Sequence, residues 1–311
     1  MKNERYGLRG ERRPRLEPSP AFSGCDATHF VIAGSKSSSD AAISPKRRLL
    51  RFARNDGWAD GSAGWDVFRP LCPLVLCLAV LAGVSAAAEE LMVFHAGSLS
   101  VPFAEIAEAF EQEHPGIEVL REAAGSRACA RKISELGRRC DVFGSADYSV
   151  INTLLIPEHA SWCIRFATNE MVIAYTRQSR RADELTSASW PEILLDEAVA
   201  YGRSDPDADP CGYRAVLTMK LAEKHYDRPA LAARLRAKDR RYIRPKETDL
   251  LALLEVGAVD YIFLYRSVAQ QHDLEWLALP DAINLANPAC ADIYEAASVT
   301  ISGETPGSTL V

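Results

Sequence analysis

The chain has 311 residues, of which 25% are charged and 8% aromatic, and its net charge is −6 at pH 7. Residues 1–69 hold 13 Lys and Arg against 8 Asp and Glu, residues 70–88 hold none, and residues 89–311 hold 23 against 34. A body this acidic disfavours nucleic acid and anionic membrane surfaces as partners. We therefore expect no nucleic-acid partner, and expect any bound anion to be held by local dipoles.

Residues 1–69 differ in composition from the rest of the chain. They are rich in Arg, Ser, Gly and Pro and show no sustained apolar periodicity. Such a segment cannot bury enough apolar surface to fold on its own. We expect a disordered extension, or an upstream stretch that the true translation start excludes.

Residues 70–88 have the features of an export signal. The uncharged apolar run Pro70–Val84 follows Arg69 and ends in the small residues Ser85-Ala86-Ala87-Ala88, a sequence that signal peptidase accepts. The run has 15 residues, whereas a membrane-spanning helix needs about 20. We predict an exported protein whose mature chain begins near residues 87–89. A membrane anchor is the alternative interpretation.

From Leu91 onward, short apolar runs alternate with amphipathic segments. We expect strands at 91–94, 117–120, 141–143, 171–176, 199–201, 242–244, 261–265 and 274–279, and helices beginning near 102, 126, 190, 211, 231 and 248. Repeated strand–helix units predict an α/β protein with parallel sheets. The length of this part is enough for two small lobes.

Three Gly-Ser pairs occur where a predicted strand ends: Gly97-Ser98, Gly125-Ser126 and Gly144-Ser145. Ligands of α/β proteins gather at the carboxyl ends of strands. The start of a helix there offers backbone N–H groups without an intrahelical acceptor, and a serine adds a hydroxyl donor. The pattern is typical of an anion site, although three ordinary helix caps would produce it too.

Five cysteines follow the predicted signal, namely Cys129, Cys140, Cys163, Cys211 and Cys290. An odd number prevents complete intramolecular pairing. No C-x-x-C and no Cys/His cluster with zinc spacing is present in the sequence. We therefore expect free thiols and no cofactor.

Six segments, taken in order, resemble the tungstate/molybdate-binding proteins that supply ABC importers. They are LMVFHAGSLSVPF at 91–103, AAGSR at 123–127, SADYS at 145–149, FATNEMVIAYT at 166–176, DPCGYR at 209–214 and DYIFLYRSVAQQH at 260–272. The resemblance spans about residues 90–302. It implies a monomeric periplasmic protein without enzymatic activity, whose partners are the oxyanion and a membrane permease.

The resemblance also implies the fold class, an α/β periplasmic-binding-protein (type II) fold with two lobes. Residues 89–175 plus 266–311 would form the first lobe, and residues 176–265 the second. The family continues past a strand like that at residues 298–301, whereas this chain ends at Val311. We therefore expect a truncated first lobe.

The same resemblance implies which residues bind the oxyanion. These are Gly97, Ser98 and Ser126 on one lobe, and Asp209, Pro210, Cys211, Glu247 and Tyr265 on or near the other. Carboxylates near a dianion repel it by several kcal/mol, even at an effective dielectric of about 20. Asp209 and Glu247 make sense where the anion has a tungsten or molybdenum centre that accepts further oxygen ligands. By sequence alone, a turn aspartate and a first-turn helix acid remain alternatives.

Other functions stay open at this point. A binding protein for another oxyanion, such as sulfate, would use the same serines. A secreted serine hydrolase could use Ser98 with the nearby His95, although the chain has no G-x-S-x-G turn. A ligand-sensing regulator would need a helix-turn-helix module, which residues 1–69 do not contain.

Overall fold

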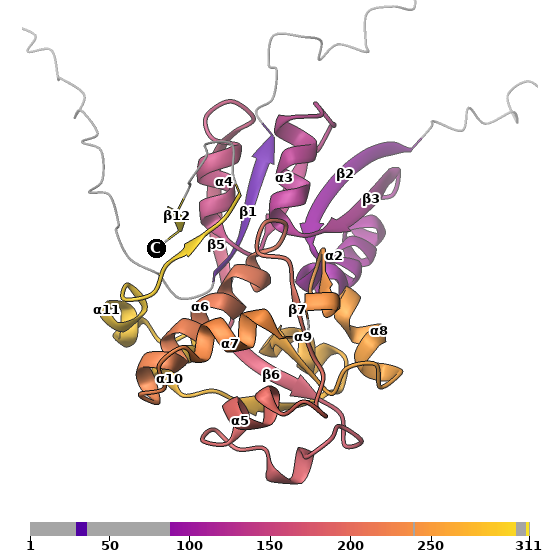
Figure 1. Ribbon diagram of the computed structural model, residues 1–311. Helices are drawn as coiled ribbons and strands as arrows, with labels where there is room; N and C mark the ends of the chain where they lie inside the picture. Colours follow the sequence, from indigo (N-terminus) through magenta and orange to yellow (C-terminus); the bar gives the residue numbers. More distant parts are fainter. Residues whose placement is uncertain (1–28, 36–87, 239, 303–308, 311) are drawn as a thin grey trace, which may run out of the picture.

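The computed structural model describes residues 29–35, 88–238, 240–302 and 309–310. Within these residues the chain forms two lobes, each built on a five-stranded sheet (Figure 1). Lobe 1 is defined by the sheet β3-β2-β4-β1-β5 and lobe 2 by the sheet β10-β6-β9-β7-β8. A short third sheet pairs β11 (Val299–Thr300) with β12 (Thr309–Leu310). The α/β fold with two lobes is therefore confirmed.

Lobe 1 occupies the upper half of Figure 1. In chain order it contains β1 (His29–Ser35), β2 (Glu89–Ala96), the short 3-10 helix η2 (Gly97–Leu99), α2 (Ser100–Glu113), β3 (Ile117–Ala124), α3 (Ser126–Ser134), β4 (Val142–Ser145), α4 (Tyr148–Leu154) and β5 (Ala160–Thr168).

Lobe 2 begins directly after β5. Its sheet and helices are β6 (Met171–Tyr175), η3 (Ala182–Glu184), α5 (Trp190–Leu195), β7 (Tyr201–Ser204), α6 (Pro210–His225), α7 (Leu231–Ala237), η4 (Arg240–Tyr242), β8 (Ile243–Arg244), α8 (Asp249–Glu255), β9 (Tyr261–Tyr265), α9 (Arg266–Gln271) and β10 (Glu275–Ala278). The short helices α10 (Asp281–Asn284), η5 (Pro288–Cys290) and α11 (Ala291–Tyr294) follow.

The two sheets share one strand topology. In lobe 1 β2 is parallel to both of its neighbours, β3 and β4, and β1 then adds antiparallel between β4 and β5. In lobe 2 β7 is parallel to both of its neighbours, β8 and β9, and β6 adds antiparallel between β9 and β10. The expectation of parallel sheets is thus wrong for the fourth strand of each sheet. Apolar periodicity cannot reveal strand direction, because a strand buried on both faces has the same pattern in either orientation.

The expected lobe boundaries also change. Residues 171–175 form β6, which pairs with β9 and β10 rather than with lobe 1. Residues 266–278, which were expected in lobe 1, form α9 and β10 of lobe 2. The first crossing between lobes therefore falls at residues 169–170. The apolar pattern of a strand does not show whether the strand joins the sheet of the lobe that precedes it or the sheet of the other lobe.

Residues 29–35 correct the expectation that residues 1–69 are unstructured throughout. This segment, HFVIAGS, forms β1 inside the lobe 1 sheet, where Val31 and Ala33 are buried. Its alternating apolar residues can be buried only because β4 and β5 leave a strand-wide gap between them. The rest of residues 1–69 and the predicted signal at 70–87 lie outside the described residues.

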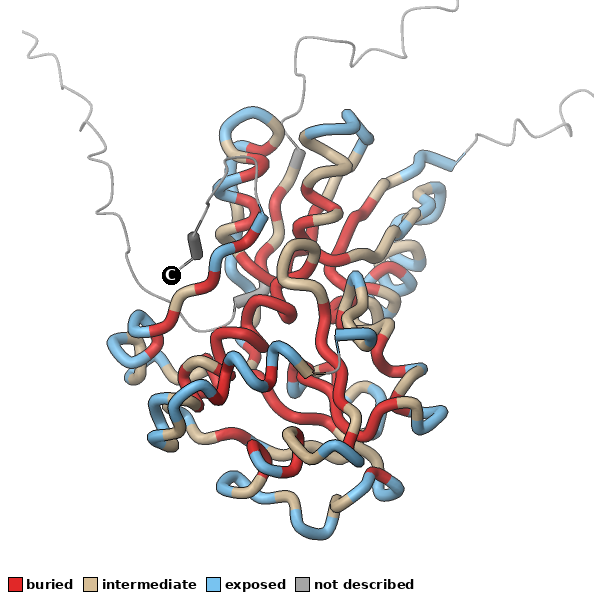
Figure 2. Tube along the Cα trace, viewed as in Figure 1, coloured by how far each residue is buried: buried red, intermediate tan, exposed pale blue. Residues whose placement is uncertain are grey.

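Apolar runs form the centre of each lobe. The segments MVIAY of β6 and YIFLY of β9 are almost wholly buried, as expected for strands covered on both faces. Phe263 of β9 makes edge-on ring contacts with Trp190 and Tyr201 at 6.0 and 5.9 Å. Figure 2 shows buried residues running through the middle of both lobes and exposed residues at their rims. Among the described residues, no helix is long and apolar enough to cross a membrane.

The placement of β1 is testable by Val31→Asp in the full-length chain. Val31 is fully buried in one cluster with Phe94 and Phe143, so the new carboxylate would have no charged partner. We expect a loss of about 3 to 5 kcal/mol in the free energy of unfolding, measured by urea titration. The control is Val256→Asp, at a site that is 77% exposed. Equal stability of the two variants would show that β1 is not part of the core.

Candidate binding site between the lobes

Two of the Gly-Ser turns meet at one edge of the lobe 1 sheet, and the third lies beside them. Ala96 of β2 lies opposite Ala124 of β3, so the turns that follow these strands start at the same level. His95 of β2 lies opposite Gly144 of β4, which brings the third turn alongside. The predicted convergence is confirmed, and its cause is the parallel pairing of β3, β2 and β4.

The three serines at these turns have different roles. Ser98 is buried, and within the described residues its hydroxyl has no hydrogen-bond partner. The Ser126 hydroxyl oxygen accepts the Ala146 N–H at 3.0 Å, so its own hydrogen points elsewhere. The Ser145 hydroxyl instead donates to the Asp147 carbonyl at 2.7 Å. Ser98 and Ser126 are therefore available as donors, whereas Ser145 stabilises its own turn.

Asp209 stands at the start of α6 in lobe 2 and is fully buried. One carboxylate oxygen accepts the Cys211 N–H at 3.4 Å, which caps the helix, and the other accepts the Glu247 N–H at 3.0 Å. The neighbouring Asp205 and Asp207 are only half-buried and accept backbone N–H groups of Asp207 and Ser302. Burial thus separates Asp209 from the two aspartates beside it in sequence.

Glu247 precedes α8 and is also fully buried. Neither of its carboxylate oxygens has a hydrogen-bond partner in the described part of the chain. Burial, and then the charge of Glu247 beside it, raise the pKa of Asp209 well above its ordinary value. A carboxylate that is buried without a cation beside it is disfavoured in its charged form. The pair is therefore prepared for an electrophilic partner that the protein itself does not supply.

The Gly-Ser turns of lobe 1 lie very close to the segments of lobe 2 that carry Asp209 and Glu247. A Cβ atom on Gly97 would lie 3.2 Å from a Glu247 carboxylate oxygen. One on Gly125 would lie 2.3 Å from the Ala208 carbonyl oxygen. That carbonyl also accepts the Ala128 N–H of α3 at 3.3 Å. Glycine is required at Gly125 because the backbone of lobe 2 touches it there, whereas at Gly97 the close neighbours are the side chains of Glu247 and Thr248.

The remaining predicted residues lie around the carboxylate pair. Pro210 is the first residue of α6, where its missing N–H costs nothing. Cys211 follows it, and burial, then the charge of Asp209, raise the pKa of its thiol. Tyr265 is buried at the end of β9, and its hydroxyl oxygen accepts a hydrogen bond from Arg214 at 2.8 Å. All eight predicted residues are buried and lie in segments that line the contact between the lobes.

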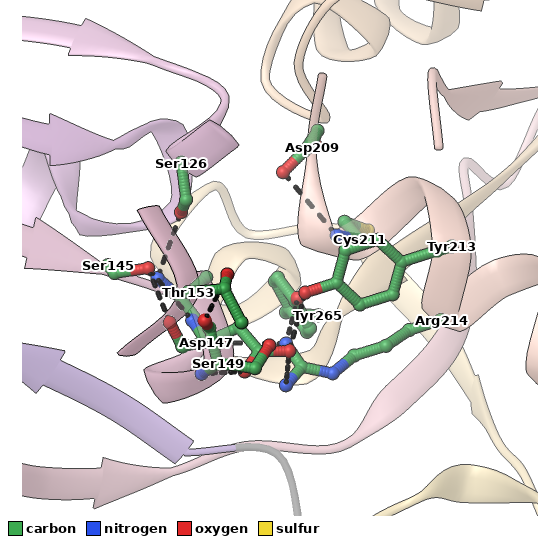
Figure 3. Close-up of polar contacts among 11 residues, drawn as sticks. Ser126, Ser145, Asp147, Ser149, Thr153, Asp209, Cys211, Tyr213, Arg214 and Tyr265 are labelled. Carbon is green, nitrogen blue, oxygen red and sulfur yellow. Dashed lines mark hydrogen bonds and ion pairs between the residues drawn. The ribbon is translucent and has the colours of Figure 1, made fainter. Parts of the chain in front are cut away.

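Sequence reasoning assigned no role to three further buried residues of this region, Asp147, Tyr213 and Arg214. Figure 3 shows them joined by hydrogen bonds and an ion pair beneath the site. All three occur in the segments SADYS and DPCGYR. The signal that could have found them is a pair of charged residues inside segments whose other residues are small or apolar.

The hydrolase alternative lacks its central contact. The His95 ring bonds through Nδ1 to the Ala96 carbonyl at 2.8 Å and packs on Phe103, with ring centroids 5.4 Å apart. The Ser98 hydroxyl forms no hydrogen bond to it among the described residues. The five cysteines predicted to be free are free. Within the described ranges, no group of three His, Cys, Asp or Glu side chains is placed to hold a metal ion.

Comparison with known proteins agrees with this architecture. Residues 91–306 match the family described as bacterial extracellular solute-binding protein, and the chain belongs to this family. It is 56% identical over 219 residues to an uncharacterized solute-binding protein of Petrotoga mobilis, covering 70% of this chain and 68% of the relative. It is 42% identical over 239 residues to the molybdate/tungstate-binding protein WtpA of Pyrococcus abyssi, covering 68% of this chain and 70% of the relative.

Among solved structures, the fold resembles the sulfate-binding protein SubI from Mycobacterium tuberculosis H37Rv. The TM-score is 0.50 at 11% sequence identity, over 67% of this chain and 80% of that one. At this identity the likeness concerns the fold alone. It supports the two-lobed arrangement.

The close approach at Gly125 leads to a testable prediction. In Gly125→Ala the added methyl group collides with a backbone carbonyl of lobe 2, which cannot rotate away as a side chain would. We expect the lobes to stay further apart, seen as a larger radius of gyration in small-angle X-ray scattering. Glu135→Ala, at the exposed end of α3, is the control. An unchanged radius in Gly125→Ala would contradict the closed contact.

The raised pKa of Asp209 predicts a pH dependence of stability. An unfolded Asp carboxyl has a pKa near 4, so at pH values between this and the raised pKa of Asp209 the folded state retains a proton that the unfolded state has lost. The resulting contribution to stability is complete below about pH 4 and is lost as the pH rises through the folded pKa. As the pH rises above about 4 and through the raised pKa of Asp209, we expect the Tm of Asp209→Asn to gain on that of the parent. A constant Tm difference would contradict the shift.

Proposed function

We propose that this protein is the extracytoplasmic binding protein of an ABC importer and captures tungstate or molybdate between its lobes. Its family membership and its 42% identity to a protein named as molybdate/tungstate-binding support this proposal. The eight residues that the sequence resemblance indicated lie where the two lobes meet. The proposed role is capture and delivery, without chemical conversion of the ligand and without a cofactor.

One observation carries the choice of ligand: two fully buried carboxylates, Asp209 and Glu247, face buried serine donors across the contact between the lobes. A dianion held only by hydrogen bonds would be repelled by these carboxylates by several kcal/mol at an effective dielectric of about 20. The tungsten or molybdenum centre of an oxyanion accepts further oxygen ligands, which turns repulsion into coordination. Sulfur and phosphorus centres are far poorer acceptors, so sulfate and phosphate are disfavoured.

Each half of the site then has its own task. Ser98 and Ser126, together with the helix starts that follow their turns, supply hydrogen bonds to the oxo groups of the anion. Asp209 and Glu247 supply oxygen ligands to the metal centre. Tyr265 adds a hydroxyl, and the turn at Pro210 and Cys211 positions the carboxylate of Asp209. Binding to the metal centre needs ionised carboxylates, so the affinity depends on pH.

The proposed location is the periplasm, reached through the export signal at residues 70–88. The proposed partner is the membrane permease of the importer, and the proposed state is a monomer. Cleavage near residues 87–89 would separate β1 from the mature chain. In that form β4 and β5 would flank an unfilled strand position in lobe 1.

The ligand assignment is tested by replacing each carboxylate with its amide. If Asp209 and Glu247 only lay near the anion, Asp209→Asn and Glu247→Gln would reduce repulsion and strengthen binding of every dianion. If they coordinate the metal centre, the same changes weaken tungstate and molybdate, by about tenfold or more for each ligand lost. Sulfate would bind no worse. Isothermal titration of each variant with tungstate, molybdate and sulfate separates these outcomes.

Ser98→Ala is the matched control for that experiment. It removes a hydrogen bond to a charged acceptor and should weaken all three anions alike, by about ten- to hundredfold. X-ray absorption at the tungsten edge gives an independent reading, because coordinated tungstate is six-coordinate. Tighter tungstate binding in both amide variants, or a tetrahedral spectrum in the parent, would refute the proposed coordination.

A further inference from the structure

A buried hydrogen-bond network joins the two lobes behind the site (Figure 3). Asp147 of lobe 1 receives two donors from α6 of lobe 2: the Tyr213 hydroxyl at 2.5 Å and the Arg214 guanidinium at 3.0 Å. Arg214 also donates to the Ala146 carbonyl of lobe 1 at 2.7 Å. All of these side chains are at least 90% buried.

Asp147 is held firmly within its own lobe. It is the N-cap residue of α4, and its second carboxylate oxygen accepts the Ser149 N–H at 2.8 Å. The carboxylate therefore has one oxygen committed to its helix and the other committed to lobe 2. Opening the lobes would leave the bond from the Ser149 N–H intact and break the bonds from Tyr213 and Arg214.

The network ends at a predicted ligand residue in each lobe. On one side the Ala146 N–H donates to the Ser126 oxygen at 3.0 Å, and on the other Arg214 donates to the Tyr265 oxygen at 2.8 Å. A hydroxyl whose oxygen accepts a bond must direct its own hydrogen elsewhere. The bonds thus turn the hydroxyl hydrogens of Ser126 and Tyr265 away from the Ala146 N–H and the Arg214 guanidinium.

We propose that Arg214, held by Asp147, is a positioning residue that couples closure of the lobes to the orientation of the hydroxyl donors. The guanidinium reaches Asp147 and the Ala146 carbonyl only when the lobes are closed. In that state the same group keeps Tyr265 oriented as a donor and braces the peptide that orients Ser126. Its effect on the ligand rests on the proposed oxyanion function, whereas its effect on closure does not.

The energetics of such a pair suit a movable contact. The cost of removing Arg214 and Asp147 from water offsets much of their attraction, so a buried ion pair selects one geometry more than it drives association. The closed state is then only weakly favoured in the absence of ligand, and the oxyanion supplies the remaining free energy. Removing one partner alone leaves a buried unpaired charge, which opposes closure strongly.

The test compares Asp147→Asn and Arg214→Lys with the parent. We expect each to weaken tungstate and sulfate by a similar factor, about ten- to hundredfold, because the network orients donors that serve any oxyanion. This distinguishes both variants from Asp209→Asn, which should weaken tungstate and molybdate but not sulfate. In Tyr265→Phe, Arg214 no longer has a Tyr265 hydroxyl to orient. Arg214→Lys should therefore reduce the affinity by a smaller factor in that background than in the parent.

The control is Asp260→Asn, which breaks a 2.8 Å ion pair with Arg180 inside lobe 2. Asp260 is buried like Asp147 but makes its contact within one lobe. It should lower the Tm without changing affinity. If Asp147→Asn and Arg214→Lys behave in the same way, with a lower Tm and parental affinity, the network is only structural and the proposal is overturned.

Small-angle scattering of the ligand-free proteins keeps this test separate from the proposed function. We expect Asp147→Asn to be more open than the parent and Asp260→Asn to match the parent. Failure of the parent to bind tungstate or molybdate would refute the proposed function and leave this comparison valid. Identical scattering of the parent and Asp147→Asn would overturn the proposed coupling.

Discussion

The structure depends on how two negative side chains are buried between the lobes without a cation from the protein. Asp209 and Glu247 are both fully buried, and among the described residues neither takes part in an ion pair. A protein tolerates such a pair only by retaining a proton or by receiving an electrophilic partner. Most features of the site follow from this constraint, including its lack of water-facing groups and the near contact of the two backbones.

Helix starts and strand ends make this arrangement possible without a positive field. The chain is acidic overall, so attraction at long range would not bring an anion to the site. The turns after β2 and β3 in lobe 1 and the start of α6 in lobe 2 instead supply oriented dipoles at short range. Gly97 and Gly125 let these turns approach lobe 2, because a side chain at either position would collide with Glu247 or Ala208.

The common strand topology of the two sheets explains why the site lies between them. In each lobe three neighbouring parallel strands (β3, β2 and β4, or β8, β7 and β9) end at one edge, and the next strand, β1 or β6, runs the other way. The carboxyl ends of β2, β3 and β4 therefore face those of β7 and β9 across the contact. In lobe 2 the antiparallel strand β6 follows directly on β5 of lobe 1, so the segment that crosses from lobe 1 helps to build the sheet that it enters.

Much of this could be predicted from the sequence, since local rules suffice for it. The apolar runs of β6 and β9, the Pro210 start of α6 and the Gly-Ser turns after β2 and β3 depend on neighbours within a few residues. The candidate ligand residues were found through segments that resemble a known family. Periodicity and spacing alone left Asp209 and Glu247 with ordinary structural interpretations.

Tertiary structure decided what depends on distant partners. Nothing near Asp147 or Arg214 in sequence indicates that they meet, because they lie on different lobes, 67 positions apart along the chain. The antiparallel placement of β1 and β6 likewise depends on which neighbours leave a gap, not on the strand itself. Sequence by itself determined the local elements and the donors available to an anion. Only the tertiary structure decided which donors face which carboxylates, because that depends on burial between two lobes rather than on local chain geometry.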